Sequence, residues 1–326
     1  MKKLLAVVVL IFVAAAAALL LMRGNAPDEG PSAPAAPVKV RVAYQPYASN
    51  APLYAAVERG YFAKEGVEVE LIKFRSSSTM MPAFLAGETD VATGSSIDIL
   101  AAATKFPGSF RIYRTGYATK DHCSDAFVVK KGAPYKSLAE FKDKKMGTFP
   151  GAATAMYAHV LFDKVLGDRD AIKLVPMSPA LLLDALGSGS VDVAWILEPM
   201  GMLGEEKGAC QYLEKGPMTK YVLDPSVSGF GIIAQSFIDK HPAAARAYVK
   251  AFTAGVMDVR ADRKAVAAYL PKYTKLSKEV AHRVPYSDSR VGEEYPIEAI
   301  EALVDLLMKE KVLDSRPDIK SLRYGE

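Results

Sequence analysis

The sequence predicts an α/β protein of two similar lobes, each a mainly parallel sheet flanked by helices, with a ligand cleft between them. The chain has 326 residues, half of them hydrophobic, and can bury a core that suits two compact lobes better than one. Strand-like and helix-like segments alternate along it, a pattern typical of parallel sheets covered by helices. The same order of segments then returns about a hundred residues later.

The first residues have the order of an export signal. Met1, Lys2 and Lys3 precede an uncharged apolar run from Leu4 to Met22. This run is close to the roughly 20 residues that cross a bilayer as a helix. Two alternatives therefore stay open for residues 1–26, a cleaved signal peptide or an N-terminal membrane anchor, and both place the folded part outside the cytoplasm.

Residues 27–37 are rich in proline, alanine and polar residues without apolar periodicity, which predicts a flexible linker. The formal net charge of +4 is spread along the chain, with no run of like charges that would indicate a nucleic-acid partner. The fold is therefore expected to begin near Val38.

The first half of the chain predicts a β-α-β arrangement. Val38 to Tyr44 alternates basic and apolar residues and runs into Gln45-Pro46, as a strand entering a loop does. Apolar residues then recur at helical spacing from Pro52 to Phe62. The predicted order continues with a strand at Val67 to Phe74, a helix after the candidate caps Ser76 to Thr79, and a third strand from Asp90.

The second half repeats this plan. It predicts a strand at Lys145 to Phe149, a helix at Ala152 to Leu166, a strand at Ala171 to Val175, and a helix opened by Ser178 and Pro179. Gly189 and Asp192 then echo Gly87 and Asp90, because in both halves glycine precedes aspartate by three residues.

The predicted crossings between lobes are the aliphatic segments Ala126 to Val129 and Gly229 to Ala234. This assigns residues 38–125 to lobe 1, 126–230 to lobe 2, and 231–326 to lobe 1 again. The tail from His241 to Lys311 is expected to be helical and to pack on lobe 1.

Several short motifs of the chain resemble one superfamily, the sulfonate, taurine, nitrate and thiamine-precursor binding proteins. The resemblance covers nearly all of the chain after the linker. It implies the type II periplasmic-binding fold, a periplasmic location, an ABC permease with its cytoplasmic ATPase as partners, and hinge closure on a solute. The motifs are Ala43-Tyr44-Gln45-Pro46, Pro52-Leu53-Tyr54-Ala55-Ala56, Glu58-Arg59-Gly60-Tyr61-Phe62, Glu65-Gly66-Val67, Leu85 to Ala92, and Glu198-Pro199.

Loops that follow strands, and the helix starts after them, are expected to line the ligand cleft because free backbone N–H groups lie there. Gly94, Ser95 and Ser96 offer close backbone approach and two hydroxyls, although a plain helix cap is the alternative. Thr154 has the same ambiguity. The predicted ligand-binding residues are Gln45, Tyr47, Asn50, Ser76, Ser77, Gly94, Ser95, Ser96, Tyr117, Phe149, Ala152, Ala153, Thr154, Trp195 and Glu198.

Tyr47, Tyr117, Phe149 and Trp195 all fall after predicted strands, which favours an aromatic wall in the cleft, with core packing as the alternative for Trp195. Glu198 would pair with a cationic group or accept ligand hydrogen bonds, or it has a structural role. The sequence does not orient Arg111, Arg114, Lys120, Asp121 or Asp125.

Cys123 and Cys210 are the two cysteines, and they could pair in an oxidising compartment or remain buried thiols. We expect no metal site, because histidines are few and no close cysteine pair exists, and we expect no cofactor.

The functional expectation is a monomeric, non-enzymatic receptor that delivers a small organic anion or heteroaromatic solute to an ABC importer. A membrane-tethered periplasmic sensory receptor is the first alternative. The third is an enzyme similar to the one that builds the thiamine pyrimidine. The resemblance implies for that enzyme a cysteine-rich stretch and a cleft histidine, and this sequence has no cysteine cluster and only scattered histidines.

Overall fold

The computed structural model describes residues 36–325. Contacts divide the chain after Ala36, and everything below concerns the unit that begins at Pro37. The predicted signal or anchor at residues 1–26, and residues 27–35 of the predicted linker, lie outside the described residues. Within the described part of the chain, no helix is both long enough and apolar enough to span a bilayer.

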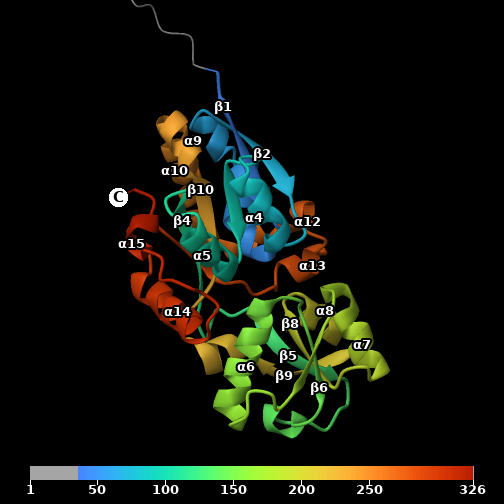
Figure 1. Cartoon of the computed structure of the whole chain (residues 1–326). Helices are drawn as coiled ribbons and strands as arrows, with labels where there is room; N and C mark the ends of the chain where they lie inside the picture. The colour runs from blue at the N-terminus through green and yellow to red at the C-terminus, as the bar shows by residue number, and fades with distance from the viewer. Residues whose placement is uncertain (1–35, 326) are drawn as a thin grey trace, which may run out of the picture. The chain divides into compact units, whose positions relative to one another are not determined.

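Two sheets organise the chain, and each defines one lobe (Figure 1). The first has the strand order β11-β4-β10-β3-β1-β2 and the second β7-β6-β8-β5-β9. The strands of the first are β1 (Val38–Tyr44), β2 (Val67–Lys73), β3 (Val91–Gly94), β4 (Phe110–Ala118), β10 (Ser226–Ala234) and β11 (Asp288–Val291). Those of the second are β5 (Asp125–Lys130), β6 (Lys145–Thr148), β7 (Lys173–Pro176), β8 (Val193–Leu197) and β9 (Cys210–Lys215).

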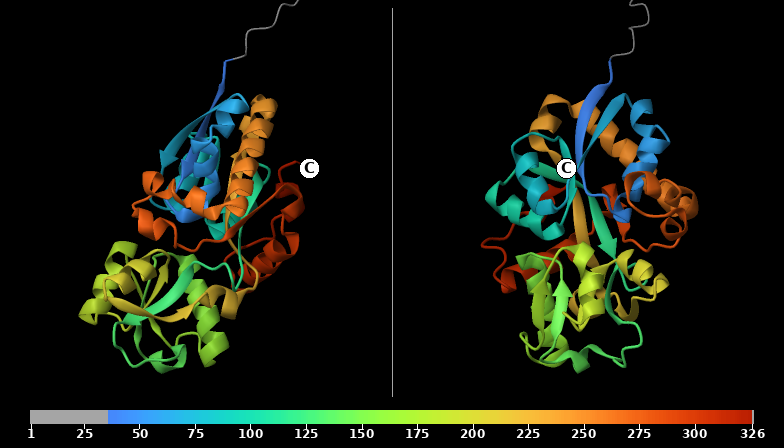
Figure 2. Two further views of the ribbon diagram at one scale, coloured as in Figure 1. Left: turned by 180° about the vertical axis from the view of Figure 1, so that it is seen from behind. Right: turned by 90° about the vertical axis from the view of Figure 1, so that its right-hand side faces the viewer.

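Helices cover both sheets. In the first lobe, α2 packs on the long helix α10, and α4 packs on α5 and β3 (Figure 2). The helices of the first lobe are α2 (Ala51–Glu58), α3 (Tyr61–Lys64), α4 (Ser77–Leu85), α5 (Ser96–Lys105), α9 (Gln235–Lys240), α10 (Pro242–Ala261), α11 (Arg263–Ala267), α12 (Leu270–Tyr273), α13 (Lys278–Ala281), α14 (Ile297–Lys309) and α15 (Ile319–Leu322). Those of the second are α6 (Ala152–Leu166), α7 (Leu182–Ser188) and α8 (Met200–Glu206).

The predicted two-lobed α/β fold is confirmed, but both sheets are mixed rather than mainly parallel. In the first sheet β1 pairs in parallel with β2 and β3, whereas β10 runs antiparallel to β3 and β4. In the second, β5 runs antiparallel to β8 and β9. These antiparallel strands flank the two passages of the chain between lobes, where a strand leaves one sheet and its successor enters the other.

The internal repeat has a structural counterpart. The backbone N–H of Arg41 donates to the Asp90 carboxylate at 2.8 Å, and the Asp90 N–H donates back to the Arg41 carbonyl at 2.9 Å. Lys145 and Asp192 exchange the same pair of bonds in the second lobe, at 2.9 Å each. In both lobes the aspartate therefore fixes the start of the third strand of the β-α-β unit beside the first.

The chain passes between the lobes at residues 119–124 and 216–225. The predicted boundary at residues 230 and 231 falls inside β10, whose full length pairs with β4. The tail is helical as expected except for the short edge strand β11, which the sequence reading did not identify.

Candidate functional site

The carboxyl ends of the parallel strands in both sheets lie beside the two passages. β4 runs in the same direction as β1 and β3, so Ala118 ends at the edge where those strands also end. In the second sheet β5 begins at Asp125, opposite Leu197 at the carboxyl end of β8. The edges that carry the predicted ligand loops therefore face the same junction.

The second lobe contacts the first through one face of α6. Ala153, Met156, Tyr157 and Val160 recur at helical spacing and pack against the hydrophobic cluster of the first lobe. Burial raises the pKa of the Tyr157 phenol, and its hydrogen bond with the Ser96 side chain partly offsets this rise. Ser96 also donates to the Val227 carbonyl at 2.8 Å, so this hydroxyl links both lobes and β10.

Ion pairs join the lobes at two further places. Arg169 of the second lobe contacts Glu310 at 2.8 Å, and Arg283 contacts Glu206 of α8. Met202 of α8 also belongs to the cluster of the first lobe.

Three predicted residues of the first lobe form one buried polar network. The Ser77 hydroxyl donates to the Gln45 side-chain oxygen at 3.2 Å and accepts the Ser95 backbone N–H at 2.8 Å. Gly94 permits this approach, because a Cβ there would lie 2.7 Å from Met80 and 3.1 Å from the Ser77 hydroxyl. The network holds the loops after β1, β2 and β3 together.

Other predicted polar residues serve their own loops. Asn50 is buried and donates to the Gln45 carbonyl at 2.8 Å, and Ser76 caps α4 by accepting the Thr79 N–H at 3.3 Å. For Ser76 the structure favours the helix-cap alternative. Ala152 begins α6, and Thr154 is half-buried in its first turn.

The predicted aromatic wall does not form. Trp195 is buried in the core of the second lobe, where its ring packs against Phe127 with centroids 5.4 Å apart. Phe149 packs on a different cluster of that lobe, and Tyr47 is exposed. Trp195 points into its own sheet's core because side chains alternate along β8, which the position at a strand end does not reveal.

Glu198 has structural partners. Its carboxylate accepts the Tyr212 hydroxyl at 2.5 Å and the Met202 backbone N–H at 3.1 Å. It therefore anchors the first turn of α8 to β9, in agreement with the structural alternative.

The possible disulfide is corrected, because both cysteines are free thiols in this structure. Cys210 is buried and its sulfur lies beside the Gly201 carbonyl, whereas the Cys123 sulfur lies beside Gly216. Burial raises the pKa of Cys210 to about 11 and also raises that of Cys123.

The residues that the sequence could not orient take distinct positions. Arg111 donates to the carbonyls of Gly108 and Phe110, Lys120 pairs with Asp224 at 3.2 Å, and Asp121 is exposed. Arg114 is buried and donates to the Ser289 hydroxyl and the Ser49 carbonyl, both at 3.0 Å. Asp125 is buried beside Trp195.

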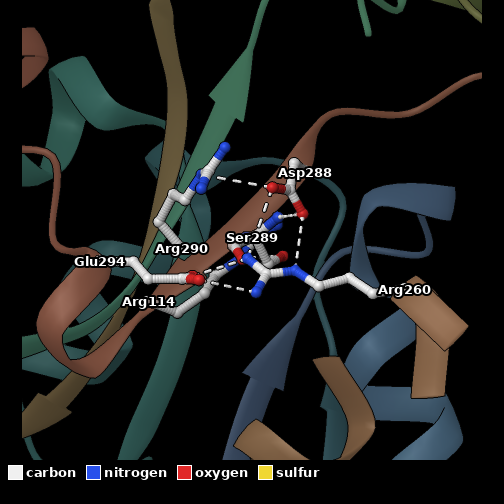
Figure 3. A network of polar contacts seen from close by, with 6 residues as sticks. All are labelled: Arg114, Arg260, Asp288, Ser289, Arg290 and Glu294. Atoms are coloured by element: carbon white, nitrogen blue, oxygen red, sulfur yellow. Dashed lines mark hydrogen bonds and ion pairs between the residues drawn. The ribbon is translucent and has the colours of Figure 1, made fainter. Parts of the chain in front are cut away.

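Arg114 leads to a polar network that the sequence analysis missed (Figure 3). Arg260 donates to both Glu294 oxygens at 2.9 and 2.7 Å and lies 3.4 Å from Asp288, which also pairs with Arg290 at 3.3 Å. Arg260 holds the pKa of Glu294 below its ordinary value. The sequence signal was a helical stripe that changes from Val256 and Val259 to Arg260 and Arg263.

This network borders a cavity of about 440 Å³ at the junction. Tyr117 is the one predicted site residue on its wall, and its ring lies under the Arg290 guanidinium at 4.7 Å. Among residues 36–325 no group of three or more histidine, cysteine or acidic side chains could hold a metal ion.

The fold is that of the periplasmic binding proteins. The aliphatic sulphonate binding protein SsuA of Escherichia coli matches it with a TM-score of 0.69 and 18% sequence identity, over 88% of this chain and 92% of SsuA. A family model described as NMT1/THI5 like matches residues 48–265, and the chain belongs to this family. The superfamily resemblance in the sequence is thereby confirmed.

Two further comparisons bear on function. A binding protein of Brucella abortus is 25% identical over 164 residues, 50% of this chain and 49% of that protein, so the chain spans about half the length of the curated relatives it matches. The desulfurization enzyme DSZB shares the fold with a TM-score of 0.67 and 14% identity, over 89% of this chain and 97% of DSZB. The fold therefore occurs in both binding proteins and an enzyme.

Proposed function

We propose that the protein is the solute-binding receptor of an ABC importer. It captures a small organic anion or heteroaromatic solute between its lobes in the periplasm and delivers it to a permease driven by a cytoplasmic ATPase. The observation that carries this proposal is the junction between the lobes. There the sheet edges that carry the predicted ligand loops face each other, and α6 packs on the first lobe. Family membership supports it.

The two passages of the chain serve as the hinge. Residues 119–124 and 216–225 connect the lobes without belonging to either sheet. Changes in backbone dihedral angles at a few such residues are enough to open and close two rigid lobes. A solute that contacts both lobes then stabilises the closed form by its differential affinity.

Two hydroxyl groups on opposite lobes are our candidates for solute hydrogen bonds. Ser95 follows β3 of the first lobe and Thr154 lies in the first turn of α6, and both are half-buried. Within residues 36–325 neither side-chain oxygen has a hydrogen-bond partner, in contrast to Ser77 and Ser96. Each hydroxyl can donate one hydrogen bond and accept others.

The enzyme alternative is motivated by the fold shared with DSZB. A cysteine nucleophile requires a thiolate, which a lowered pKa supplies. Burial instead raises the pKa of both Cys123 and Cys210. This electrostatic environment supports binding over cysteine-based catalysis.

The test is a thermal-shift screen of the full chain with taurine, alkane- and arylsulfonates, nitrate, bicarbonate, pyrimidines, flavins and aromatic carboxylates. A solute that binds only the native state raises the melting temperature by mass action. We expect a hit that also decreases the radius of gyration in solution scattering. If no compound of the panel raises the melting temperature, or if the protein converts the bound compound into a product, the proposed receptor function is contradicted.

The variants Ser95→Ala and Thr154→Val test the assigned hydroxyls. Each is expected to weaken the hit several-fold, on the order of 1 kcal/mol for one neutral hydrogen bond. Ser78→Ala is the matched control, because Ser78 is exposed and its hydroxyl contacts Ser76. Unchanged affinity in both variants would refute this placement.

A further inference from the structure

The cavity beside the junction is built from four separate parts of the chain. Pro52 lies in the first turn of α2, and Tyr117, Thr119 and His122 lie at the end of β4 and in the first passage. The remaining walls come from the α10–α11 region and residues 286–290. Its volume of about 440 Å³ lies within the roughly 300–1,000 Å³ of small-molecule sites.

The walls carry more positive than negative charge. Arg260, Arg263 and Arg290 line the cavity together with one carboxylate, Asp288. Glu294 neutralises Arg260, and Asp288 is shared between Arg260 and Arg290. No carboxylate of the described residues lies within ion-pair distance of Arg263, so its charge and part of that of Arg290 stay uncompensated.

Two aromatic rings hold these guanidinium groups. Arg263 lies over the Tyr286 ring at 3.7 Å and donates to the Val284 carbonyl at 3.1 Å, and Arg290 lies over Tyr117. A stacked guanidinium is planar and restricted, so it loses less conformational freedom when it binds an oxyanion through its N–H groups.

Tyr286 supplies an independent sign of a missing acceptor. Tyr286 is 4% exposed, and within residues 36–325 its hydroxyl has no hydrogen-bond partner. Leaving a buried polar group unpaired costs roughly 1–3 kcal/mol. Burial raises the pKa of Tyr286, which keeps the phenol protonated as a donor at neutral pH.

We propose that this cavity binds the carboxylate or sulfonate group of a small organic solute, with Arg263, Arg290 and Tyr286 as its donors. The aliphatic side chains of Pro52, Val256 and Val259 form the apolar part of the lining and receive the carbon body of the solute. The inference rests on the proposed receptor function and adds an anion-binding cavity beside the junction, which is lined by the first lobe and the first passage rather than by Ser95 and Thr154.

The position of the cavity links this site to closure. Thr119 and His122 line the cavity and belong to the first passage between lobes. A solute held by the arginines of the first lobe therefore touches a segment that must move when the lobes close.

The experiment measures binding of benzoate and benzenesulfonate to the purified full chain by calorimetry, with benzamide and benzyl alcohol as neutral isosteres. We expect the anions to bind and the isosteres to bind at least ten-fold more weakly. Arg263→Gln and Arg290→Gln are expected to weaken anion binding at least ten-fold, and Tyr286→Phe several-fold.

Tyr286→Phe also separates binding from folding. Because its hydroxyl is buried without a partner in the free protein, this variant should keep or raise the wild-type melting temperature without ligand while losing affinity. Arg246→Gln is the matched control, since Arg246 is an exposed arginine of the same helix as Arg260, and it should bind the anions as the wild type does.

The outcomes are distinguishable. Anion binding that is unchanged in Arg263→Gln, Arg290→Gln and Tyr286→Phe would overturn the anion site and leave the receptor function standing. The same holds if only neutral solutes of the wider panel bind. Absence of any binding across that panel would overturn both proposals.

Discussion

The indole Nε1 of Trp195 donates a hydrogen bond to a carboxylate oxygen of Asp125, across 3.2 Å in the core of the second lobe. The backbone N–H of Met218 donates to the same oxygen at 3.0 Å. Burial raises the pKa of Asp125, and the two hydrogen bonds only partly offset it. The carboxylate thus joins the start of β5 to β8 and to the second passage between lobes.

We predict that Asp125→Asn gains stability relative to the wild type as pH rises. A raised folded-state pKa means that the folded protein holds its proton more tightly than the unfolded chain does. The contribution of Asp125 is therefore fully present below the unfolded pKa and is lost as pH rises through the folded pKa. Asparagine keeps an oxygen acceptor and does not titrate.

Urea denaturation of the two proteins between pH 4 and 7 measures this difference. The free energy of unfolding of Asp125→Asn minus that of the wild type should increase across the range. Asp121→Asn, at an exposed position in the first passage, is the control. A difference for Asp125→Asn that does not change with pH would contradict the prediction.

A second prediction concerns the close approach of α10 to α2. A Cβ at Gly255 would lie 2.2 Å from the Pro52 carbonyl oxygen, a backbone atom that cannot rotate away. Gly255→Ala should therefore lower the free energy of unfolding by roughly 2 kcal/mol, despite the better helix propensity of alanine. It should also weaken solute binding, since Pro52 lines the cavity.

Gly187 is the matched position. It lies in α7 with nothing within 4 Å of a built Cβ, so Gly187→Ala should be neutral or stabilise by about 0.5–1 kcal/mol. Chemical denaturation of both variants is the measurement. Equal effects at the two positions would show that the packing of α10 on α2 is looser than described.

A third prediction concerns the ion pairs that join the lobes, Arg169 with Glu310 and Arg283 with Glu206. Arg283 and Glu206 are both exposed, so their pair contributes only about 0.2–1 kcal/mol. The Glu310 side chain is 9% exposed, so loss of its partner Arg169 costs more. Because the pairs exist only when the lobes meet, Arg169→Ala with Arg283→Ala should weaken solute binding about three- to ten-fold with little change in melting temperature.

Calorimetry and solution scattering check this third expectation. The double variant should show a larger radius of gyration without solute. Arg316→Ala removes two ion pairs made within the first lobe, with Glu301 and Asp305, and should change neither quantity. A double variant with wild-type affinity would mean that these pairs do not stabilise the closed form.

A fourth prediction concerns the thiols. Cys210 is buried and its pKa is raised to about 11, so a thiol reagent should label it only after unfolding. Cys123 is half-buried and should react slowly in the native state. Two thiols titrated in denaturant without reductant would confirm that they are unpaired, and none would establish a disulfide.

Local sequence signals predicted most of the elements. Gly87 and Gly189 both adopt positive φ at the ends of helices, and Asp90 and Asp192 both bond back to the first strand of their lobe. Such features depend on residues close in sequence or on one neighbouring strand. The edge strand β11 escaped notice because its residues, Asp288 to Val291, are few and mostly polar.

The candidate site was predictable only in part. The strand ends of both sheets face the junction, since parallel strands end at one edge of a sheet, and the assignment of the loops there to ligand binding stays a prediction. Side-chain direction was not predictable, as Trp195 and Glu198 show by facing their own lobe. Arg114 could equally have been an exposed strand charge.

The sequence by itself determined two α/β lobes, their internal repeat and the family, because hydrophobic periodicity, turn residues and short motifs are local properties of the chain. Only the tertiary structure decided which polar residues meet. Arg263 comes from α11, and Tyr286 and Arg290 come from residues 286–290; these two segments of the tail converge with Tyr117 at one cavity. Their convergence depends on the packing of α10 and the pairing of β11 with β4, which are long-range contacts that no local pattern encodes.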